Sequence, residues 1–135
     1  MTSPLDHLKE LTREPADTKE FEGLKRAGLA RLKDAANAQL SKDSRFDLAY
    51  NASHSLCLAA LRYRGYRSAK RYLVFQTLPH TLGLGPEVWR VLAKAHDVRN
   101  KREYEGETEV DERLLTDVIA ACGAVSKAIG ALKPL

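Results

Sequence analysis

The chain has 135 residues and a mass of 15.0 kDa, which leaves room for one domain and excludes a two-domain enzyme. Apolar residues make up 44% and charged residues 30%, so the chain is apolar enough to form a hydrophobic core and is not disordered throughout. A net charge of +4 and an isoelectric point near 9.1 are only mildly basic, so total charge alone indicates no particular partner.

The first predicted element is a helix near the N-terminus. Ser3, Pro4 and Asp6 are typical of a helix start, because serine caps free amides, proline suits the first helical position and the acid completes a capping box. We expect this helix to end before Pro15.

The second and third predicted helices are long. Asp17 and Glu20 have capping-box spacing, and a helix is expected from Asp17 to about Leu40. The third is expected to start at residues 41–44 and to reach Tyr63. Apolar residues cover more than half of its circumference, which predicts a central helix with neighbours on several sides. They are Phe46, Ala49, Tyr50, Leu56, Cys57, Ala60, Leu61 and Tyr63.

A short element follows the glycine at position 65. Ser68 is a candidate cap, and the element is expected to end near Leu78, because Pro79 disfavours helix in the residue before it. Residues 72–75 also suit a strand by propensity. A lone strand would have no partner elsewhere in the chain, so a helix is favoured.

The last two predicted helices are again long. Residues 79–85 are expected to form a loop, after which Pro86 starts a helix that Gly106 ends. Thr108 and Asp111 form a capping box for the final helix. An apolar stripe suited to packing along a neighbouring helix follows at steps of three and four, formed by Leu115, Val118, Cys122, Val125, Ile129 and Leu132.

These elements together predict an all-α fold: an antiparallel up-and-down bundle of four long helices with one or two short extra helices, in a single domain over residues 1–135. Cys57 and Cys122 lie within apolar helical patterns and are expected to be small, buried core residues in a reducing compartment. No apolar stretch is long enough to span a membrane and no signal peptide is apparent, so we expect a cytoplasmic protein without a membrane partner.

Charge is unevenly distributed along the chain. Residues 62–72, here called the basic run, carry five basic side chains and no acid, whereas residues 103–112 carry six acids and no base. Cations bind phosphates and aromatic rings stack on unpaired bases, so the basic run is a candidate site for single-stranded RNA or a nucleotide. A solvated turn that covers the end of the bundle is the alternative. The candidate binding residues are Tyr66, Arg67, Lys70 and Arg71.

Common catalytic motifs are missing from the sequence. There is no glycine-rich phosphate loop, no paired-histidine metal helix and no Gly-x-Ser-x-Gly turn. The four histidines lie in different elements and no two of them are three or four residues apart, so we expect no metal site and no cofactor. His54, on the broad apolar helix, is expected to be a core or boundary side chain.

One polar segment carries a family resemblance. The pair Arg99–Asn100, followed at the helix end by Tyr104, resembles the Arg-polar-x-x-x-His/Tyr signature of HEPN domains. These are small all-helical, nucleotide-associated domains found in ribonuclease toxins and defence systems. Residues 49–67 resemble the earlier central helix and turn of that family, and the resemblance extends over about residues 46–132. A blander alternative is that the segment forms ordinary surface pairs between residues four apart.

The resemblance implies roles for these residues. In family members that cut RNA, the signature residues lie near a two-fold dimer interface, where two copies form one metal-independent cleft. Arg99 would hold the scissile phosphate, Asn100 would orient it, and Tyr104 would stand where the general acid or base is expected. Tyrosine, with a reference pKa of about 10, is a poor base at neutral pH. His96, one turn before Arg99, is a weaker candidate for that role.

Three functions remain open at this point. The first is a HEPN-like RNA- or nucleotide-binding module, noncatalytic or weakly active, in a toxin–antitoxin or defence system. The second is a metal-independent endoribonuclease that uses Arg99, Asn100 and Tyr104 at a dimer cleft. The third is a helical dimerisation or protein-binding protein. The resemblance also implies a homodimer and a nucleotidyltransferase-type antitoxin as partner, with Tyr104 as the residue that it modifies.

Overall fold

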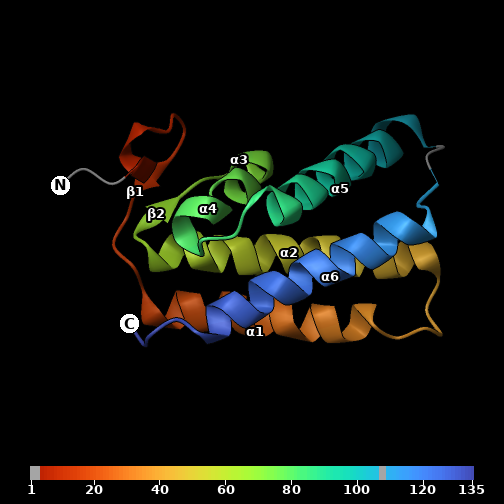
Figure 1. Ribbon diagram of the computed structural model, residues 1–135, viewed down its shortest axis with the longest axis horizontal. Coiled ribbons are helices and arrows are strands. Elements are labelled where there is room, and N and C mark those ends of the chain that lie inside the picture. The colour runs from red at the N-terminus through yellow and green to blue at the C-terminus, as the bar shows by residue number, and fades with distance from the viewer. Residues whose placement is uncertain (1–3, 107–108) are drawn as a thin grey trace.

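The fold, described by a computed structural model over residues 4–106 and 109–135, is an all-α bundle. Successive long helices run in opposite directions, as the predicted up-and-down bundle requires (Figure 1). Among the described residues the long helices are α1 (Thr18–Ala35), α2 (Lys42–Tyr63), α5 (Pro86–Glu105) and α6 (Glu112–Gly130). The short elements are a 3-10 turn (Pro4–His7), α3 (Arg71–Gln76), α4 (Leu78–Thr81) and the strands β1 (Thr12–Arg13) and β2 (Tyr66–Arg67).

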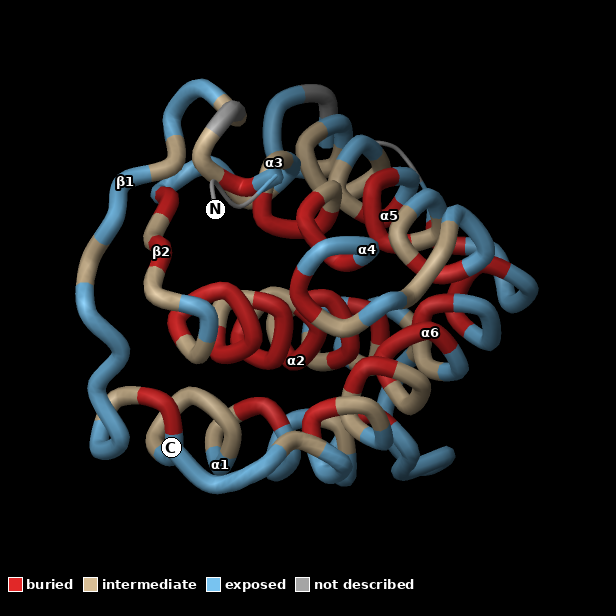
Figure 2. The backbone as a smooth tube through the Cα atoms, turned by 60° about the vertical axis from the view of Figure 1, so that its left-hand side comes forward, coloured by how far each residue is buried: buried red, intermediate tan, exposed pale blue. Residues whose placement is uncertain are grey.

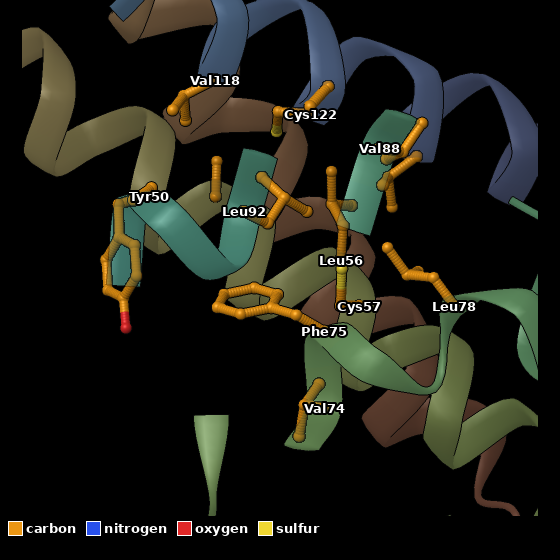
Figure 3. Close-up of a cluster of buried hydrophobic side chains, with 14 of the residues drawn as sticks. Tyr50, Leu56, Cys57, Val74, Phe75, Leu78, Val88, Leu92, Val118 and Cys122 are labelled. Carbon is orange, nitrogen blue, oxygen red and sulfur yellow. The ribbon is translucent and has the colours of Figure 1, made fainter. Parts of the chain in front are cut away.

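Helix α2 lies at the centre of the molecule, as its broad apolar surface predicts. Helices α1, α3, α5 and α6 all pack against it, and most of its residues are buried (Figure 2). Side chains of α2, α3, α4, α5 and α6 pack together in one core (Figure 3). The Tyr50 ring lies at the edge of this core, with its hydroxyl pointing away from the apolar side chains (Figure 3). At the position of Tyr50, the surface of α2 therefore changes from the apolar core to a polar face.

Helix ends follow the capping chemistry that the sequence suggests. The side chains of Asp17, Ser41 and Asp111 accept hydrogen bonds from backbone amides in the first turns of α1, α2 and α6. Gly106 ends α5 in the left-handed conformation, with φ 74°. Thr108, the other half of the capping box expected for α6, lies outside the described residues.

The helix predicted before Pro15 is present only as a short 3-10 turn that begins at Pro4. From residue 4 to residue 15, only Pro4–His7 is helical, and Thr12–Arg13 pairs with Tyr66–Arg67 in a small antiparallel ladder. The amide of Glu14 also donates to the Gly65 carbonyl oxygen at 2.9 Å. The N-terminal segment thus pairs as a strand with residues 66–67, a pairing that the sequence did not reveal.

Three predicted boundaries also differ from the structure. Helix α1 ends at Ala35 rather than near Leu40, and the Arg45 side chain donates to the Ala35 carbonyl oxygen there. Ser68 caps a turn at the Lys70 amide, so α3 begins after it. Pro79 lies in the first turn of α4, where its missing amide costs little, although a loop was expected.

Both cysteines are free and buried, as predicted. Burial raises the pKa of Cys57 well above its ordinary value and that of Cys122 to about 11. Neither thiol is therefore a reactive nucleophile in the folded protein. Within the residues that the structure covers, no helix is long and apolar enough to cross a membrane.

Close packing of α1 on α2 depends on Gly28. A Cβ atom at this position would lie 2.5 Å from Cγ of Leu56, which is fully buried and cannot move aside. We expect Gly28→Ala to lower the free energy of unfolding by about 2 kcal/mol through overpacking. Gly23→Ala, in the same helix with nothing within 4 Å of the added Cβ, is expected to raise it by about 0.5–1 kcal/mol. Urea denaturation of both variants checks this contrast, and equal effects would contradict it.

Candidate nucleic-acid interface

Most basic side chains of the basic run form ion pairs with acidic side chains of the protein itself. Arg62 is only 1% exposed, and its Nε donates to the Glu20 carboxylate at 2.5 Å. Arg67 contacts the carboxylates of Glu14 and Glu20 at 2.8 and 2.5 Å. Hydrogen bonds from the two arginines hold the pKa of Glu20 below its ordinary value. The charge of Arg67, which was expected to be available to RNA, is thus largely neutralised by the carboxylates of Glu14 and Glu20.

Two other predicted RNA-binding residues are also engaged. Tyr66 is 4% exposed and its hydroxyl donates to Asp6 Oδ1 at 2.6 Å, so its ring has no face free for a base. Lys70 Nζ lies 2.7 Å from Glu10 Oε1. The prediction of a stacking role for Tyr66 is therefore wrong, and the N-terminal segment supplies acids to both Arg67 and Lys70.

Arg71 differs from the other basic residues of the run, because it lies over the same tyrosine ring as Arg99. Its Nη1 donates to Asn51 Oδ1 of α2 at 3.1 Å, and its Cζ lies 5.5 Å from the centroid of the Tyr50 ring. The Cζ of Arg99, on α5, lies 5.3 Å from the same centroid. We call Arg71 and Arg99 the arginine pair. Short helix α3 and long helix α5 thus bring two cations to one tyrosine of the central helix.

The arginine pair is surrounded by polar groups from the same elements. His96 Nδ1 lies 2.9 Å from the Tyr50 hydroxyl, and its Nε2 lies 3.1 Å from Nδ2 of Asn100. An amide nitrogen only donates, so Nε2 accepts and Nδ1 carries the proton that is shared with Tyr50. This arrangement is that of a neutral imidazole.

Burial and the arginines keep both nearby imidazoles neutral. Burial lowers the pKa of His54 to about 4, with a smaller contribution from Arg71 and Arg99. The pKa of His96 is also lowered, mainly by burial and partly by the two arginines. The positive charge of the site at neutral pH therefore belongs to the arginine pair, which suits an anion.

An open depression of about 590 Å³ lies next to the arginine pair, between the first half of α2 and the last half of α5. Arg99 Nη2 lies 2.9 Å from Glu103 Oε1, and Arg102 contacts Asp47 at 3.2 Å. The depression thus combines charges of both signs. Its lining residues are Asp43, Asp47, Asn51, Arg99, Arg102, Glu103, Gly106 and Glu109.

Tyr104 lies outside this cluster of contacts. It is 86% exposed, one helical turn beyond Asn100, and makes no hydrogen bond or ring contact with any described residue. The structure thus brings together Arg99, Asn100, His96 and Arg71, and leaves Tyr104 on the open surface. The proton-transfer role that the resemblance implied for Tyr104 has no supporting contact within the described part of the chain.

Sequence reasoning missed Tyr50 and Asn51 as parts of this site. Tyr50 was assigned to the core, because a buried tyrosine that supports two cations has the same apolar pattern as any other core ring. A signal was present at Asn51 and His54, since polar residues three apart interrupt a broad apolar helix and mark a face with polar neighbours.

Comparisons of the chain with models of known protein families, with curated proteins and with solved structures find no match. Among the described residues, no group of three or more His, Cys, Asp or Glu side chains is placed to hold a metal ion. The function is therefore argued from the arginine pair and its surroundings.

Glu103 competes with any anion for Arg99, because its carboxylate already pairs with that guanidinium. We expect Glu103→Gln to raise the affinity for inorganic pyrophosphate about twofold to fivefold, since an exposed ion pair is weak and its loss frees only one donor group. Isothermal titration at low salt measures this change. Glu87→Gln, near the opposite end of α5, is the control, and an equal gain in both variants would contradict a local effect.

Proposed function

We propose that the protein is a HEPN-like module that binds RNA or a nucleotide through the arginine pair, with little or no cleavage. The observation that carries the proposal is the convergence of Arg71 and Arg99 on the Tyr50 ring, at 5.5 and 5.3 Å. Two guanidinium groups from separate helices offer planar donors in the geometry that phosphate oxygens accept. The resemblance of Arg99 and Asn100 to the HEPN signature supports the same position.

The surroundings favour a phosphate over other anions. Arg71 forms no ion pair with any described residue, and its hydrogen-bond acceptor is the neutral Asn51. The neutral His96 and Asn100 add polar groups without adding charge. A phosphodiester brings one negative charge and several acceptor oxygens, which match one free guanidinium and a second that is only partly neutralised by Glu103.

A second candidate is a metal-independent endoribonuclease, and the position of His96 favours it. The ring of His96 is hydrogen-bonded to Asn100, and its lowered pKa keeps it neutral at physiological pH, so it is able to accept a proton. The base would take the proton of the ribose 2′-hydroxyl, whose oxygen attacks the adjacent phosphorus. The bond between phosphorus and the 5′-oxygen then breaks, the leaving oxygen takes a proton from water, and Arg99 stabilises the charge that develops on the phosphate.

The proposal extends to assembly and partners. Two copies pair as a homodimer in the cytoplasm, and a nucleotidyltransferase-type antitoxin acts on the exposed Tyr104. These points rest on the HEPN resemblance, with the 86% exposure of Tyr104 as support for its accessibility to an enzyme. Sedimentation at micromolar concentration tests the dimer, since a monomer would contradict it.

The test of the function is RNA binding and cleavage in EDTA with wild type, Arg99→Ala and Arg90→Ala. Arg90 is an exposed arginine nine residues earlier in α5, on the opposite side of the helix, and serves as the matched control. We expect wild type and Arg90→Ala to bind a labelled single-stranded RNA with affinity that falls as salt rises. Arg99→Ala should bind about tenfold more weakly.

The outcomes separate the candidates. Binding without product supports the module, whereas products with 2′,3′-cyclic phosphate ends that disappear in Arg99→Ala support the endoribonuclease. Equal RNA affinity of Arg99→Ala and wild type contradicts both. A dimer that binds no RNA favours the third function, a helical dimerisation protein.

A further inference from the structure

We propose that Tyr72 is a stacking surface for an unpaired base, so that the ligand of the arginine pair is single-stranded RNA rather than a duplex or a bare phosphate. The inference rests on the proposed function, because it assigns the second half of a site whose phosphate-binding half is the arginine pair. It adds a residue that selects the type of nucleic acid.

Consecutive residues of α3 point to different parts of the same site. Arg71 points to Asn51 and the Tyr50 ring on α2, whereas the neighbouring Tyr72 remains 40% exposed. The Tyr72 ring lies 5.9 Å from the His96 ring, with an angle of 64° between the two planes. An exposed aromatic face is thus directly beside the imidazole that joins Tyr50 to Asn100.

The other tyrosines do not offer such a face at this site. Tyr50 and Tyr66 are 1% and 4% exposed, and the Tyr63 hydroxyl donates to the backbone carbonyl of Lys133. Tyr104 is exposed but makes no contact with a described residue that would fix its ring. Contact with His96 holds the ring of Tyr72, which reduces the entropy that stacking would otherwise cost.

Cations beside an accessible ring are the usual composition of a single-strand binding site. The arginine pair would hold the backbone, and the flat face of Tyr72 would hold the adjoining base whatever its identity, because every base has a π-face. A double helix keeps its bases stacked on one another and so presents no free face to Tyr72. Tyr72 therefore contributes to binding of single strands and not to binding of a duplex or an abasic strand.

The experiment compares three probes by fluorescence anisotropy: a labelled single-stranded RNA, a duplex of the same length and an abasic ribose-phosphate strand. The variants are Tyr72→Ala, Tyr72→Phe and Leu29→Ala, the last a control that removes a 39% exposed apolar side chain from α1. Circular dichroism confirms that each variant is folded. We expect Tyr72→Ala to bind the single-stranded RNA about 5- to 100-fold more weakly. Tyr72→Phe and Leu29→Ala should bind it like wild type.

The abasic strand distinguishes stacking from an indirect effect. Its affinity should be the same for wild type and Tyr72→Ala, because no base is present to stack. Unchanged RNA affinity in Tyr72→Ala, or an equal loss for RNA and the abasic strand, would overturn the role of Tyr72 and leave the proposed function standing. Failure of wild type to bind any of the probes would overturn the proposed function and this inference together.

Discussion

Replacement of Arg62 with methionine is expected to lower the free energy of unfolding by about 3 kcal/mol, the largest single effect that we expect in the molecule. The guanidinium is 1% exposed and lies between α2 and the N-terminal segment. It donates to Glu20 at 2.5 Å and to the carbonyl oxygens of Glu14 and Pro15 at 2.9 and 2.7 Å. Methionine fills a similar volume but removes the buried donor that these two carbonyl oxygens and the Glu20 carboxylate share.

The size of the effect follows from what is left behind. Glu14 and Glu20 are partly exposed and keep Arg67 as a partner, so the loss is near the lower end of the range for broken buried ion pairs. Arg62→Lys keeps the charge, but one ammonium group cannot reach all of the acceptors. An intermediate loss of about 1–2 kcal/mol is expected for it.

Urea denaturation with an unchanged slope measures both variants. The control is Arg113→Met, an exposed arginine in the first turn of α6, for which a change within about 0.5 kcal/mol is expected. Faster proteolysis near residues 4–15 in Arg62→Met would show that Arg62 attaches the N-terminal segment. Equal stability of Arg62→Met and the control would contradict a structural role for the buried ion pairs.

The second large effect is a loss of stability in mild acid that depends on His54. In the unfolded chain His54 takes up a proton near pH 6.5, whereas burial lowers its pKa in the folded protein to about 4. The stabilisation is therefore complete above pH 6.5 and is lost as the pH falls toward 4. The loss amounts to about 2–3 kcal/mol by pH 4.5, since a tenfold change in a proton-binding constant corresponds to about 1.4 kcal/mol.

Denaturation between pH 7 and 4.5 checks this prediction, at pH values above the range in which Glu20 takes up a proton in the folded protein. His54→Gln should remove most of the pH dependence, and the smaller remainder belongs in part to His96, whose pKa is lowered in the same direction. His80→Gln, at an exposed position in α4, should keep the full dependence. Parallel curves for wild type and His54→Gln would mean that the surroundings of His54 are less apolar and less cationic than the structure describes.

The long helices could be predicted because their signals are local. Caps such as Asp17 and Ser41, the glycine at 106 and the apolar stripes each act within a few residues, and the structure has α2, α5 and α6 where the pattern indicates. The prediction for the N-terminal segment failed for the opposite reason. Its pairing with residues 66–67 depends on contacts more than fifty residues away, which no local pattern reveals.

The candidate site divides in the same way. His96, Arg99 and Asn100 lie within one turn or so of a single helix, so the sequence places them together. The sequence shows the charges of the basic run but does not show their partners. Glu20 lies 42 residues from Arg62, and the tertiary fold decides that Arg62 is buried while Arg71 reaches Tyr50. Of the basic residues that the charge count singled out in the basic run, only Arg71 therefore belongs to the candidate site.

The most direct test of a shared phosphate site is a double-mutant cycle of Arg71→Ala and Arg99→Ala, measured as the Kd for single-stranded RNA at fixed low salt. Each single variant should bind about tenfold more weakly, and the double variant should lose less than the product of the two losses, because both guanidinium groups hold the same phosphate. If neither single variant changes Kd by more than the Arg90→Ala control does, the arginine pair is not the binding site.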